Sequence, residues 1–504
     1  MTKLWLGIDV GTTAVKAAAY EPDGRQVALA EAPSTVNSDT RGGHEQDMGE
    51  VRDTVFRVLH DLARQCPNAD FAALGVAAQG DGLWCIDAKG APAGPAMLWN
   101  DTRSAEDLAH LTQTGNLGVV GRGCHTSLWT GTSAMLWRWC RTHRPDVVAK
   151  TAHAVTCADW VGLCLTGHVA SDYSNTSIPF LDFQTKTYGS AQIEALGCTD
   201  IAQHLASPRR ADSLLSQLSA DAAHATGLPE RLPVSVGTLD LSAMIVGMGM
   251  DQPGQTMMIL GTTAVVNILT DKVEPSDTPV GASVLHPTSD AIIRVLAPTT
   301  GAAAFDWFAG LHPQSLGGAS AGEIATRMNA LVTDVPPGSN GVTFLPYLNG
   351  ERAPFVAPDI RAAFHGLSAT TTKGEMGRAV MEGAAFSLRH CFEEEGGLPN
   401  APVRLTGGGA RNAVWCQIIA DVVGQPVVVS DAPDHGLWGA AAIGAAAAGL
   451  GDAVSLAARR AEQAETFTPR NHAAYSAPYR RYATLSRHHR AMQTDLSSAS
   501  KDQP

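Results

Sequence analysis

One short pattern occurs twice in this chain, once in each half. GIDVGTTAV begins at residue 7 and MMILGTTAV begins at residue 257, so Gly-Thr-Thr lies between two apolar stretches in both places. The stretches at residues 4–10 and 14–20 predict the two strands of a hairpin, as do those at residues 256–260 and 264–269. Because the pattern keeps both flanking strands and divides the chain in half, it predicts two related domains that meet near residue 250.

Helices and strands are mixed along the rest of the chain. Apolar residues recur at helical spacing over residues 50–64 and 375–398, and a short strand at 403–405 precedes a helix that Asn412 can cap. This mixture predicts an α/β fold. We expect an N-terminal domain over 1–248, a C-terminal domain over 249–470 and a basic tail over 471–504 that forms a surface helix with a frayed end.

Composition excludes several classes of function. The chain has 504 residues, with 36 Lys and Arg against 49 Asp and Glu, and this net charge of −13 argues against binding to nucleic acid or to a membrane surface. The nine cysteines include no C-x-x-C pair, which favours reduced thiols over disulfides or structural zinc. Residues 439–450 are almost all Ala and Gly, too few to span a membrane, and predict a closely packed helix. Without a signal-peptide pattern at the N-terminus, we expect a cytoplasmic protein.

Glycine-rich loops are the candidates for nucleotide binding. Backbone N–H groups and Thr hydroxyls of the two Gly-Thr-Thr loops can bind phosphate oxygens, although each loop could also be a simple turn. Asp9, just before the first loop, could hold Mg²⁺ through water. Three glycines at 407–409, between a strand and a helix, leave room for an adenine or a ribose, or else for close packing of strand on helix. The G-x-x-x-x-G-K-[ST] phosphate loop is absent from the sequence.

Polar residues elsewhere are candidates for the reacting acceptor. Asp240 ends a strand-like run and could accept a proton from a hydroxyl group, although it could instead cap the helix that follows. AAQGDGLW and LWNDTR combine carboxylates and amides with tryptophan, as a small polyhydroxyl ligand requires, or as turns beside core tryptophans would.

These motifs together resemble the FGGY carbohydrate kinases. GIDVGTTAVK is similar to the first phosphate motif of that family, AAFHGLSATTTKGEMGRAVMEG to its C-terminal signature, TGGGARNAVW to its adenosine motif and GTLD to the segment with its catalytic aspartate. They follow the family's order from residue 7 to about residue 450. The resemblance implies two actin-like (ribonuclease H-like) domains with an interdomain cleft, ATP and Mg²⁺ as cofactors, and phosphorylation of a terminal hydroxyl. It also implies a homodimer as one oligomeric state.

The resemblance also implies roles for individual residues. Asp240 would be the catalytic base and Asp9 the residue near the metal. The acceptor would contact Gln79, Asp81, Trp99, Asn100, Asp101 and Asp240. ATP would contact Gly11, Thr12, Thr13, Lys16, Gly261, Thr262, Thr263, Gly301, Gly408, Gly409 and Asn412.

Two departures from the family bear on the acceptor. No lysine occurs between Gly123 and Lys150, where the family's other signature usually has one, and QGDGLW replaces the QMHG of ordinary xylulose kinases. Because Asp81 would repel a carboxylated sugar, we expect a neutral ketopentose such as xylulose or a tetritol such as erythritol. L-Xylulose, ribulose and glycerol remain alternative acceptors, and a non-catalytic actin-like nucleotide-binding protein is the alternative from another class.

Overall fold

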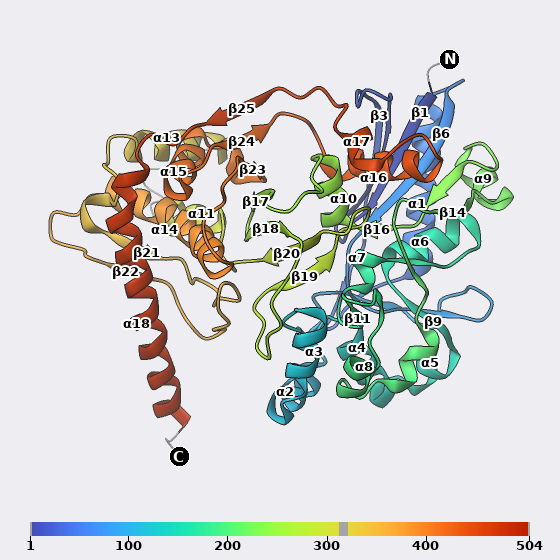
Figure 1. Cartoon of the computed structure of the whole chain (residues 1–504), viewed down its shortest axis with the longest axis horizontal. Coiled ribbons are helices and arrows are strands. Elements are labelled where there is room, and N and C mark those ends of the chain that lie inside the picture. Colours follow the sequence, from blue (N-terminus) through green and yellow to red (C-terminus); the bar gives the residue numbers. More distant parts are fainter. Residues whose placement is uncertain (1–2, 312–320, 502–504) are drawn as a thin grey trace. The chain divides into compact units, whose positions relative to one another are not determined.

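The computed structural model describes residues 3–311 and 321–501, and it has the α/β architecture that the sequence predicts (Figure 1). The chain forms two compact units. The first contains Met1–Pro253, Thr270–Ile293 and Ala432–Glu462, and the second contains Gly254–Leu269, Arg294–Asp431 and Gln463–Pro504. The chain therefore passes between the units several times, whereas the sequence predicted a single division after residue 248.

The first unit is built on a sheet with the strand order β14-β15-β6-β1-β2-β3. β1 (Lys3–Val10) and β2 (Ala14–Tyr20) form the predicted antiparallel hairpin, and β6 (Asp70–Ala78) runs parallel to β1 on its other side. The remaining strands are β3 (Gln26–Pro33), β14 (Leu214–Gln217), β15 (Pro233–Ser235) and the two-residue β16 (Thr238–Leu239), which also pairs with β6.

Helices cover both faces of this sheet. Because side chains alternate along a strand, Leu6 and Ile8 of β1 pack with the apolar face of α1 (Met48–Gln65), whereas Trp5 points to the other face. There it stacks on Trp438 of α16 (His435–Ala447), with ring centroids 5.8 Å apart.

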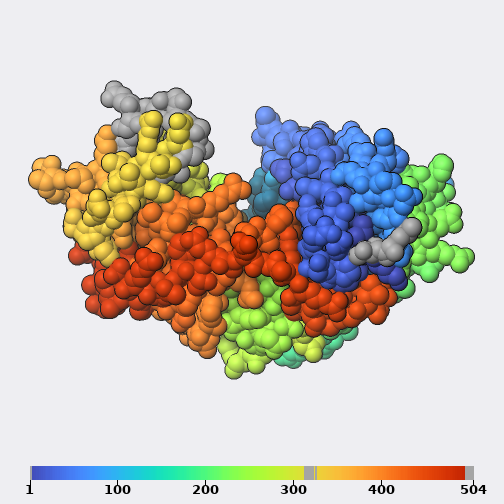
Figure 2. All heavy atoms as spheres, turned by 90° about the horizontal axis from the view of Figure 1, so that it is seen from above, coloured from blue at the N-terminus to red at the C-terminus, as the bar shows by residue number. Residues whose placement is uncertain are grey.

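Glycines allow α16 to pack directly on the backbone of the sheet. A Cβ at Gly7 would lie 2.1 Å from Leu437 O, and one at the neighbouring Gly75 would lie 1.7 Å from Ala440 O. α16 is the helix expected from the Ala and Gly content of residues 439–450, but it begins earlier, after its N-cap residue Asp434. The sequence assigned it to the C-terminal domain, but its small residues fit the sheet of the first unit. Figure 2 shows red atoms of the late part of the chain against the blue N-terminal part. A Cβ at Gly24 would lie 2.6 Å from Arg460 Cβ.

The other elements of the first unit surround this sheet. The helices are α2 (Ala105–Thr114), α3 (Asn116–Cys124), α4 (Ser133–His143), α5 (Pro145–Lys150), α6 (Cys157–Thr166), α7 (Tyr173–Thr176), α8 (Ser190–Ala195), α9 (Ala220–Thr226), α10 (Asp240–Gly247) and α17 (Ala453–Ala457). The short strands are β4 (Asn37–Ser38), β5 (His44–Gln46), β7 (Trp84–Asp87), β8 (Ala96–Met97), β9 (Thr151–Val155), β10 (Ser171–Asp172), β11 (Leu181–Asp182), β12 (Thr187–Tyr188) and β13 (Pro208–Arg209). The strands β19 (Ala282–Leu285) and β20 (Ile292–Leu296) belong instead to the second seven-stranded sheet, where they are the first two strands in the order β19-β20-β18-β17-β23-β24-β25.

The second unit repeats the arrangement of the first. Its strands β18 (Ala264–Thr270), β17 (Thr256–Leu260), β23 (Val403–Thr406), β24 (Val427–Ser430) and β25 (Ala464–Phe467) are adjacent in that order. β17 and β18 form an antiparallel hairpin and β23 runs parallel to β17, as β6 does to β1. The other elements are α11 (Ala303–Gly310), α13 (Ala321–Val332), α14 (Lys373–Glu394), α15 (Ala413–Val423), α18 (Ser476–Lys501), β21 (Thr343–Leu345) and β22 (Ala363–His365).

The basic tail is more than a surface helix. Tyr479 and Tyr482 of α18 are buried against Phe386 of α14, and the hydroxyl groups of Tyr347 and Ser486 are 2.7 Å apart. The tyrosines lie three residues apart on one helix face, an apolar stripe that the basic composition of the tail hides. The tail therefore forms the expected helix, with many exposed residues, but its buried face packs into the core of the second unit rather than lying apart from it.

Two further expectations concern thiols and membranes. All nine cysteines are free, which agrees with the absence of a disulfide framework. Over residues 3–311 and 321–501, no helix combines the length and the apolar character that crossing a bilayer needs.

Candidate active site

The hairpin loop of the first unit carries the first predicted phosphate site. Gly11 N–H donates to Ala14 O at 3.0 Å, and Thr13 O accepts from Ser34 N–H at 2.9 Å, so the loop is held from both sides. Lys16 lies opposite Asp9 in the β1–β2 register, and its Nζ is 3.7 Å from the Asp434 carboxylate. The loop thus places backbone N–H groups and one ammonium group close to Asp9.

Three aspartates of this region have raised pKa values. Desolvation by the surrounding protein raises the pKa of Asp9 to about 8, and the charges of Asp240 and Asp434 add to the shift. Desolvation likewise raises the pKa of Asp81 to about 7, with a contribution from Asp240, and that of Asp240 to about 6. Such shifts are typical of groups that move protons or bind cations.

Asp434 is the carboxylate that the sequence did not reveal. It caps α16 by accepting from Leu437 N–H at 3.1 Å, and it has a positive φ of 44°. A Cβ at Gly436 would lie 4.0 Å from Asp9 Oδ2, so α16 begins beside Asp9. In the sequence, Asp434 could be recognised as a helix cap at most. Nothing there placed it near Asp9, because the two residues are more than 420 positions apart.

Short-range contacts fix the backbone before Asp240. Thr238 pairs with Ala77 of β6, and its hydroxyl donates to the buried Asp172 carboxylate at 2.8 Å. Ser174 Oγ accepts from Leu239 N–H at 3.3 Å. Asp240 itself is the first residue of α10, and its Oδ1 accepts from Leu241 N–H at 2.6 Å, whereas the N-cap position belongs to Leu239. The structure therefore does not support the alternative in which Asp240 is the cap of this helix.

All of the predicted acceptor residues lie in the same unit as Asp240. Gln79 directly follows β6, and its N–H donates to Val10 O at 3.0 Å. Trp99 is 41% exposed, and its Nε1 donates to Thr12 Oγ1 at 3.2 Å, which joins an acceptor residue to the phosphate loop. Asn100 Oδ1 is buried without a hydrogen-bond partner among the described residues, so it is open to a ligand hydroxyl.

Asp101 differs from its expected role. It is fully buried, and its carboxylate accepts from His44 N–H and forms an ion pair with Arg103 at 2.6 Å. Arg103 also binds Glu45 and packs over the ring of Trp139. The carboxylate of Asp101 thus stabilises the fold. Its partner Arg103 is only two residues away, but the sequence did not show that the pair would be buried against His44, which lies 57 residues earlier in the chain.

The second Gly-Thr-Thr loop lies in the second unit. Gly261 N–H donates to Thr263 O at 3.0 Å, and Gly301 N–H donates to Thr262 O at 3.0 Å. A Cβ at Gly301 would lie 2.4 Å from Thr263 O, so this position admits only glycine without a shift of the backbone. Gly301 therefore supports the loop.

The three consecutive glycines differ from one another. A Cβ at Gly407 would lie 2.8 Å from Leu260 O and one at Gly409 would lie 2.5 Å from Leu260 Cδ2, as the packing alternative requires. Around Gly408, none of the residues that the structure describes has an atom within 4 Å of such a Cβ, which leaves room there for a flat ligand. Asn412 is the N-cap of α15, as expected, and its Nδ2 donates to Asn329 Oδ1 at 2.9 Å.

The residues near Asp9 fit a magnesium ion. Asp9 Oδ1 is buried without a hydrogen-bond partner among the described residues, and further carboxylates are close enough to raise the pKa of Asp9. Over residues 3–311 and 321–501, no three His, Cys, Asp or Glu side chains form a ready cluster of metal ligands. Mg²⁺ does not need one, because it keeps several waters and uses one or two carboxylates together with substrate phosphates.

Two family models together match most of the chain. The FGGY family of carbohydrate kinases, N-terminal domain, matches residues 4–247, and the C-terminal domain of the same family matches residues 256–448. The chain belongs to the FGGY family of carbohydrate kinases. This chain is therefore a carbohydrate kinase that uses ATP, and the alternative of a non-catalytic nucleotide-binding protein is excluded.

Individual relatives agree with this family membership. The chain is 31% identical over 463 residues to an erythritol kinase of Brucella abortus, with 88% of this chain and 87% of the relative covered. It is 27% identical to a probable L-xylulose kinase of Pasteurella multocida, with 97% of this chain and 99% of the relative covered. In fold it is similar to a xylulose kinase from Rhodospirillum rubrum, with a TM-score of 0.89, 24% identity and coverage of 97% and 100%.

Proposed function

We propose that this kinase transfers the γ-phosphoryl group of ATP to a terminal hydroxyl of a small neutral polyol or ketose, with Asp240 as the base. The observation that supports it is the environment of Asp240, whose pKa is raised to about 6 in the unit that also holds Gln79, Asp81 and the phosphate loop. A carboxylate with this pKa is ionised at neutral pH and still basic enough to accept a proton during attack.

The proposed reaction is a direct displacement. The acceptor oxygen forms a bond to the γ-phosphorus while the bond from this phosphorus to the β–γ bridging oxygen breaks, and the hydroxyl proton passes to the Asp240 carboxylate. Gln79, Asp81 and Asn100 would hold the other hydroxyl groups, and the exposed face of Trp99 would pack on the C–H face of the acceptor. ADP and the phosphorylated acceptor are the products.

Backbone groups would bind the phosphates of ATP. The N–H groups of Gly11 and Gly261 donate within their own loops, so the N–H groups of Thr12, Thr13, Thr262 and Thr263 are the ones proposed to bind phosphate oxygens. Lys16 adds a positive charge. Gly408 would lie against the nucleoside, while Gly301, Gly409 and Asn412 hold the surrounding backbone.

Asp9 would hold Mg²⁺, chiefly through water, with Asp434 near it. The ion would neutralise charge on the phosphates as it does in phosphoryl transfer generally. Lys16, paired with Asp434, limits the negative charge at this end of β1.

The acceptor is proposed to be a neutral compound of four or five carbons. Asp81 carries a partial negative charge at pH 7 and would repel an aldonate. Relatives named erythritol, L-xylulose and xylulose kinase have acceptors of this size, and ribulose and glycerol remain alternatives. The nine free thiols support a reducing, cytoplasmic location for this reaction, and a homodimer is the oligomeric state that we propose.

A coupled ADP-release screen tests this proposal. The acceptors would be C3–C7 polyols, ketoses and aldonic acids at equal concentration with Mg²⁺ and ATP. We expect one neutral C4 or C5 acceptor to have the highest kcat/KM, and a preference for an aldonic acid would contradict the argument from Asp81. Asp240→Asn should lower kcat by about 10³-fold or more while ATP binding by calorimetry stays within about threefold of wild type. Near-normal turnover of this variant would remove Asp240 from the mechanism.

A further inference from the structure

Four side chains of the first unit form a continuous chain of hydrogen bonds. Thr12 Oγ1 donates to Gln79 Oε1 at 2.7 Å, Gln79 Nε2 donates to Gln46 Oε1 at 2.7 Å, and Gln46 Nε2 donates to Ser34 Oγ at 2.8 Å. Trp99 Nε1 enters at the other end by donating to Thr12 Oγ1 at 3.2 Å. This series of hydrogen bonds therefore connects Trp99, an acceptor residue, through Thr12 of the phosphate loop to Ser34 in the segment after β3.

The two glutamines in the middle are shielded from water. Gln46 is 0% exposed and Gln79 is 3% exposed. A buried amide that loses its partner cannot turn to solvent, so each glutamine fixes the orientation of the next one. The Gln79 side chain also forms a hydrogen bond with the buried Cys157 thiol. Without Gln46, Gln79 Nε2 would lose the amide oxygen that accepts from it at 2.7 Å, and the orientation of Gln79 Oε1 toward Thr12 would be less firmly fixed.

The contacts of Thr12 give it an unexpected role. Its hydroxyl hydrogen is donated to Gln79 and its oxygen accepts from Trp99, so this hydroxyl is engaged with acceptor residues. Ser34 connects the far end of this series of hydrogen bonds back to the phosphate loop. Its hydroxyl accepts from Gln46, and its N–H donates to Thr13 O at 2.9 Å. The phosphate loop is thus held at two successive residues by one hydrogen-bonded chain.

We propose that Gln46 is a positioning residue that, by fixing the amide of Gln79, aligns the acceptor residues with the phosphate loop. This inference rests on the proposed function, because it assumes that acceptor and phosphate meet at these groups. Gln46 touches neither reactant and acts only through Gln79 and Thr12. Its loss should disturb the alignment of the reacting groups more than the affinity for ATP, which the backbone of the loop supplies.

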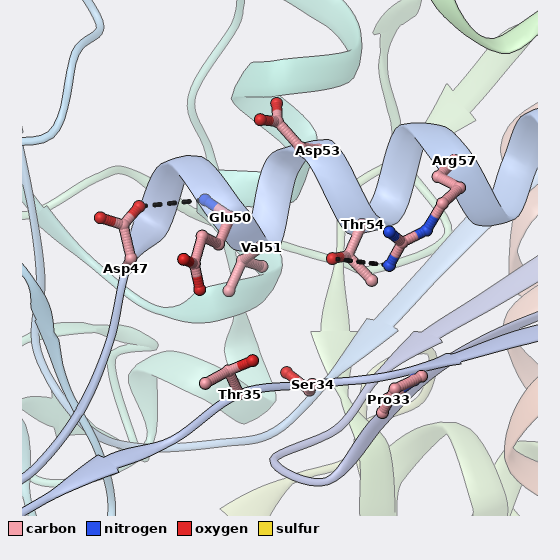
Figure 3. Close-up of a pocket in the computed structure, with 9 residues that line it drawn as sticks. All are labelled: Pro33, Ser34, Thr35, Asp47, Glu50, Val51, Asp53, Thr54 and Arg57. Carbon is pink, nitrogen blue, oxygen red and sulfur yellow. Dashed lines mark hydrogen bonds between the residues drawn. The ribbon is translucent and has the colours of Figure 1, made fainter.

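The far end of the chain differs from the middle in its access to water. Ser34 lies in the wall of a pocket of about 340 Å³ between α1 and the segment that follows β3, together with Thr35, Asp47 and Glu50 (Figure 3). In Ser34→Ala a water molecule in this pocket can replace the lost hydroxyl as partner of Gln46. In Ser34→Val the larger side chain fills that space. No such replacement is available at the fully buried Gln46.

Steady-state kinetics of four variants test the proposal. We expect Gln46→Met to lower kcat/KM for the acceptor by about tenfold or more, with the KM for ATP within about threefold of wild type. The kcat/KM of Ser34→Ala should stay within about twofold of wild type, and that of Ser34→Val should fall about fivefold.

The matched control is Gln192→Met in α8, because Gln192 is also a buried glutamine, with its Nε2 donating to Leu181 O at 3.0 Å. Its kcat/KM should stay within about twofold even though it also loses a buried hydrogen bond. Equal kinetic effects of Gln46→Met and Gln192→Met would overturn the proposal.

A spectroscopic readout separates this proposal from the proposed function. In the ligand-free protein labelled with ¹⁵N-tryptophan, the Trp99 indole N–H signal, assigned with Trp99→Phe, should shift in Gln46→Met and not in Gln192→Met. An unchanged Trp99 signal would overturn the proposal whatever the activity. If wild type phosphorylates no neutral acceptor, the proposed function fails, while the Trp99 signal still decides whether Gln46 orders this chain. Should Gln46→Met fail to fold, the comparison of Ser34→Val with Ser34→Ala decides it, and equal activities of those two would refute it.

Discussion

At the scale of single residues, the first unit concentrates negative charge where it is costly. Desolvation raises the pKa values of Asp9, Asp81 and Asp240, and repulsion from the Asp240 charge adds to the shifts of Asp9 and Asp81. A group of carboxylates of this kind lowers the stability of the empty protein and suits a site that receives a cation and a hydroxyl group. Two predictions at this scale follow from the pKa values.

The first concerns activity as a function of pH. Since Asp240 has a pKa of about 6 and must be ionised to accept a proton, kcat/KM for the acceptor should rise with pH through about 6. At pH 5 it should be about tenfold below its plateau. Initial rates from pH 5 to 8.5 in the ADP-release assay measure this. Asp81→Asn serves as the control, in which kcat/KM should still rise with pH near pH 6. A profile that is flat from pH 5 to 7 would contradict the role of Asp240.

The second concerns stability as a function of pH. The pKa of Asp81 is about 7 in the folded protein against an ordinary value of 3.8, so its stabilising contribution is complete below about pH 4 and is lost as the pH rises through 7. Asp81→Asn removes this loss of stability and should raise Tm at pH 8 by roughly 1.5–3 °C, which corresponds to about 1–2 kcal/mol after allowance for solvent screening. The gain should vanish near pH 4. Calorimetry at both pH values measures it, and an equal gain at pH 4 would show that the charge is not the cause.

At the scale of elements, the sequence predicted those strands and helix caps that depend on contacts between residues close together in the chain. The hairpin strands β2 and β17 occur with the predicted bounds, and Asn412 caps α15 as its position before an apolar run indicated. What could not be predicted depends on contacts between distant segments. Asp434 approaches Asp9 because α16 packs on β1, and the Asp101 carboxylate accepts a hydrogen bond from His44 N–H, 57 residues earlier in the chain. Gln46 is the last residue of the three-residue strand β5, which no pattern in the sequence predicted.

Close packing of α16 on the sheet gives a prediction at this scale. Gly75→Ala would place a Cβ 1.7 Å from Ala440 O, and backbone atoms on both sides cannot move apart cheaply. We expect a loss of about 3 kcal/mol or more in the free energy of unfolding, at the upper end of overpacking effects. The control is Gly118→Ala in α3, where the nearest atom would lie 3.4 Å away and the helix propensity of alanine should stabilise by up to about 1 kcal/mol. Urea unfolding of both variants measures the difference, and similar midpoints would contradict this account of the packing.

At the scale of the whole molecule, the chain builds each unit from separate segments. The first unit needs Ala432–Glu462, which carries α16, although almost 180 residues of other structure separate this segment from Pro253. The repeated motif alone predicts a single domain boundary near residue 250. The packing of α16 against Trp5 and Tyr20 crosses that boundary. The consequence can be tested with fragments.

A fragment of residues 1–248 should not fold as the motif would suggest. Without α16, the face of the sheet that holds Trp5, Gly7 and Gly75 is uncovered, so we expect strong binding of a hydrophobic dye and no cooperative melting. Adding a peptide of residues 432–462 in trans should reduce the dye signal and restore a melting transition, because its small residues fit this face. The matched control is the same peptide with Gly439→Leu, whose side chain would collide with Ala243 O, which lies 1.8 Å from a Cβ at that position. If residues 1–248 melt cooperatively alone, or if both peptides act equally, α16 is not the element that completes the first unit.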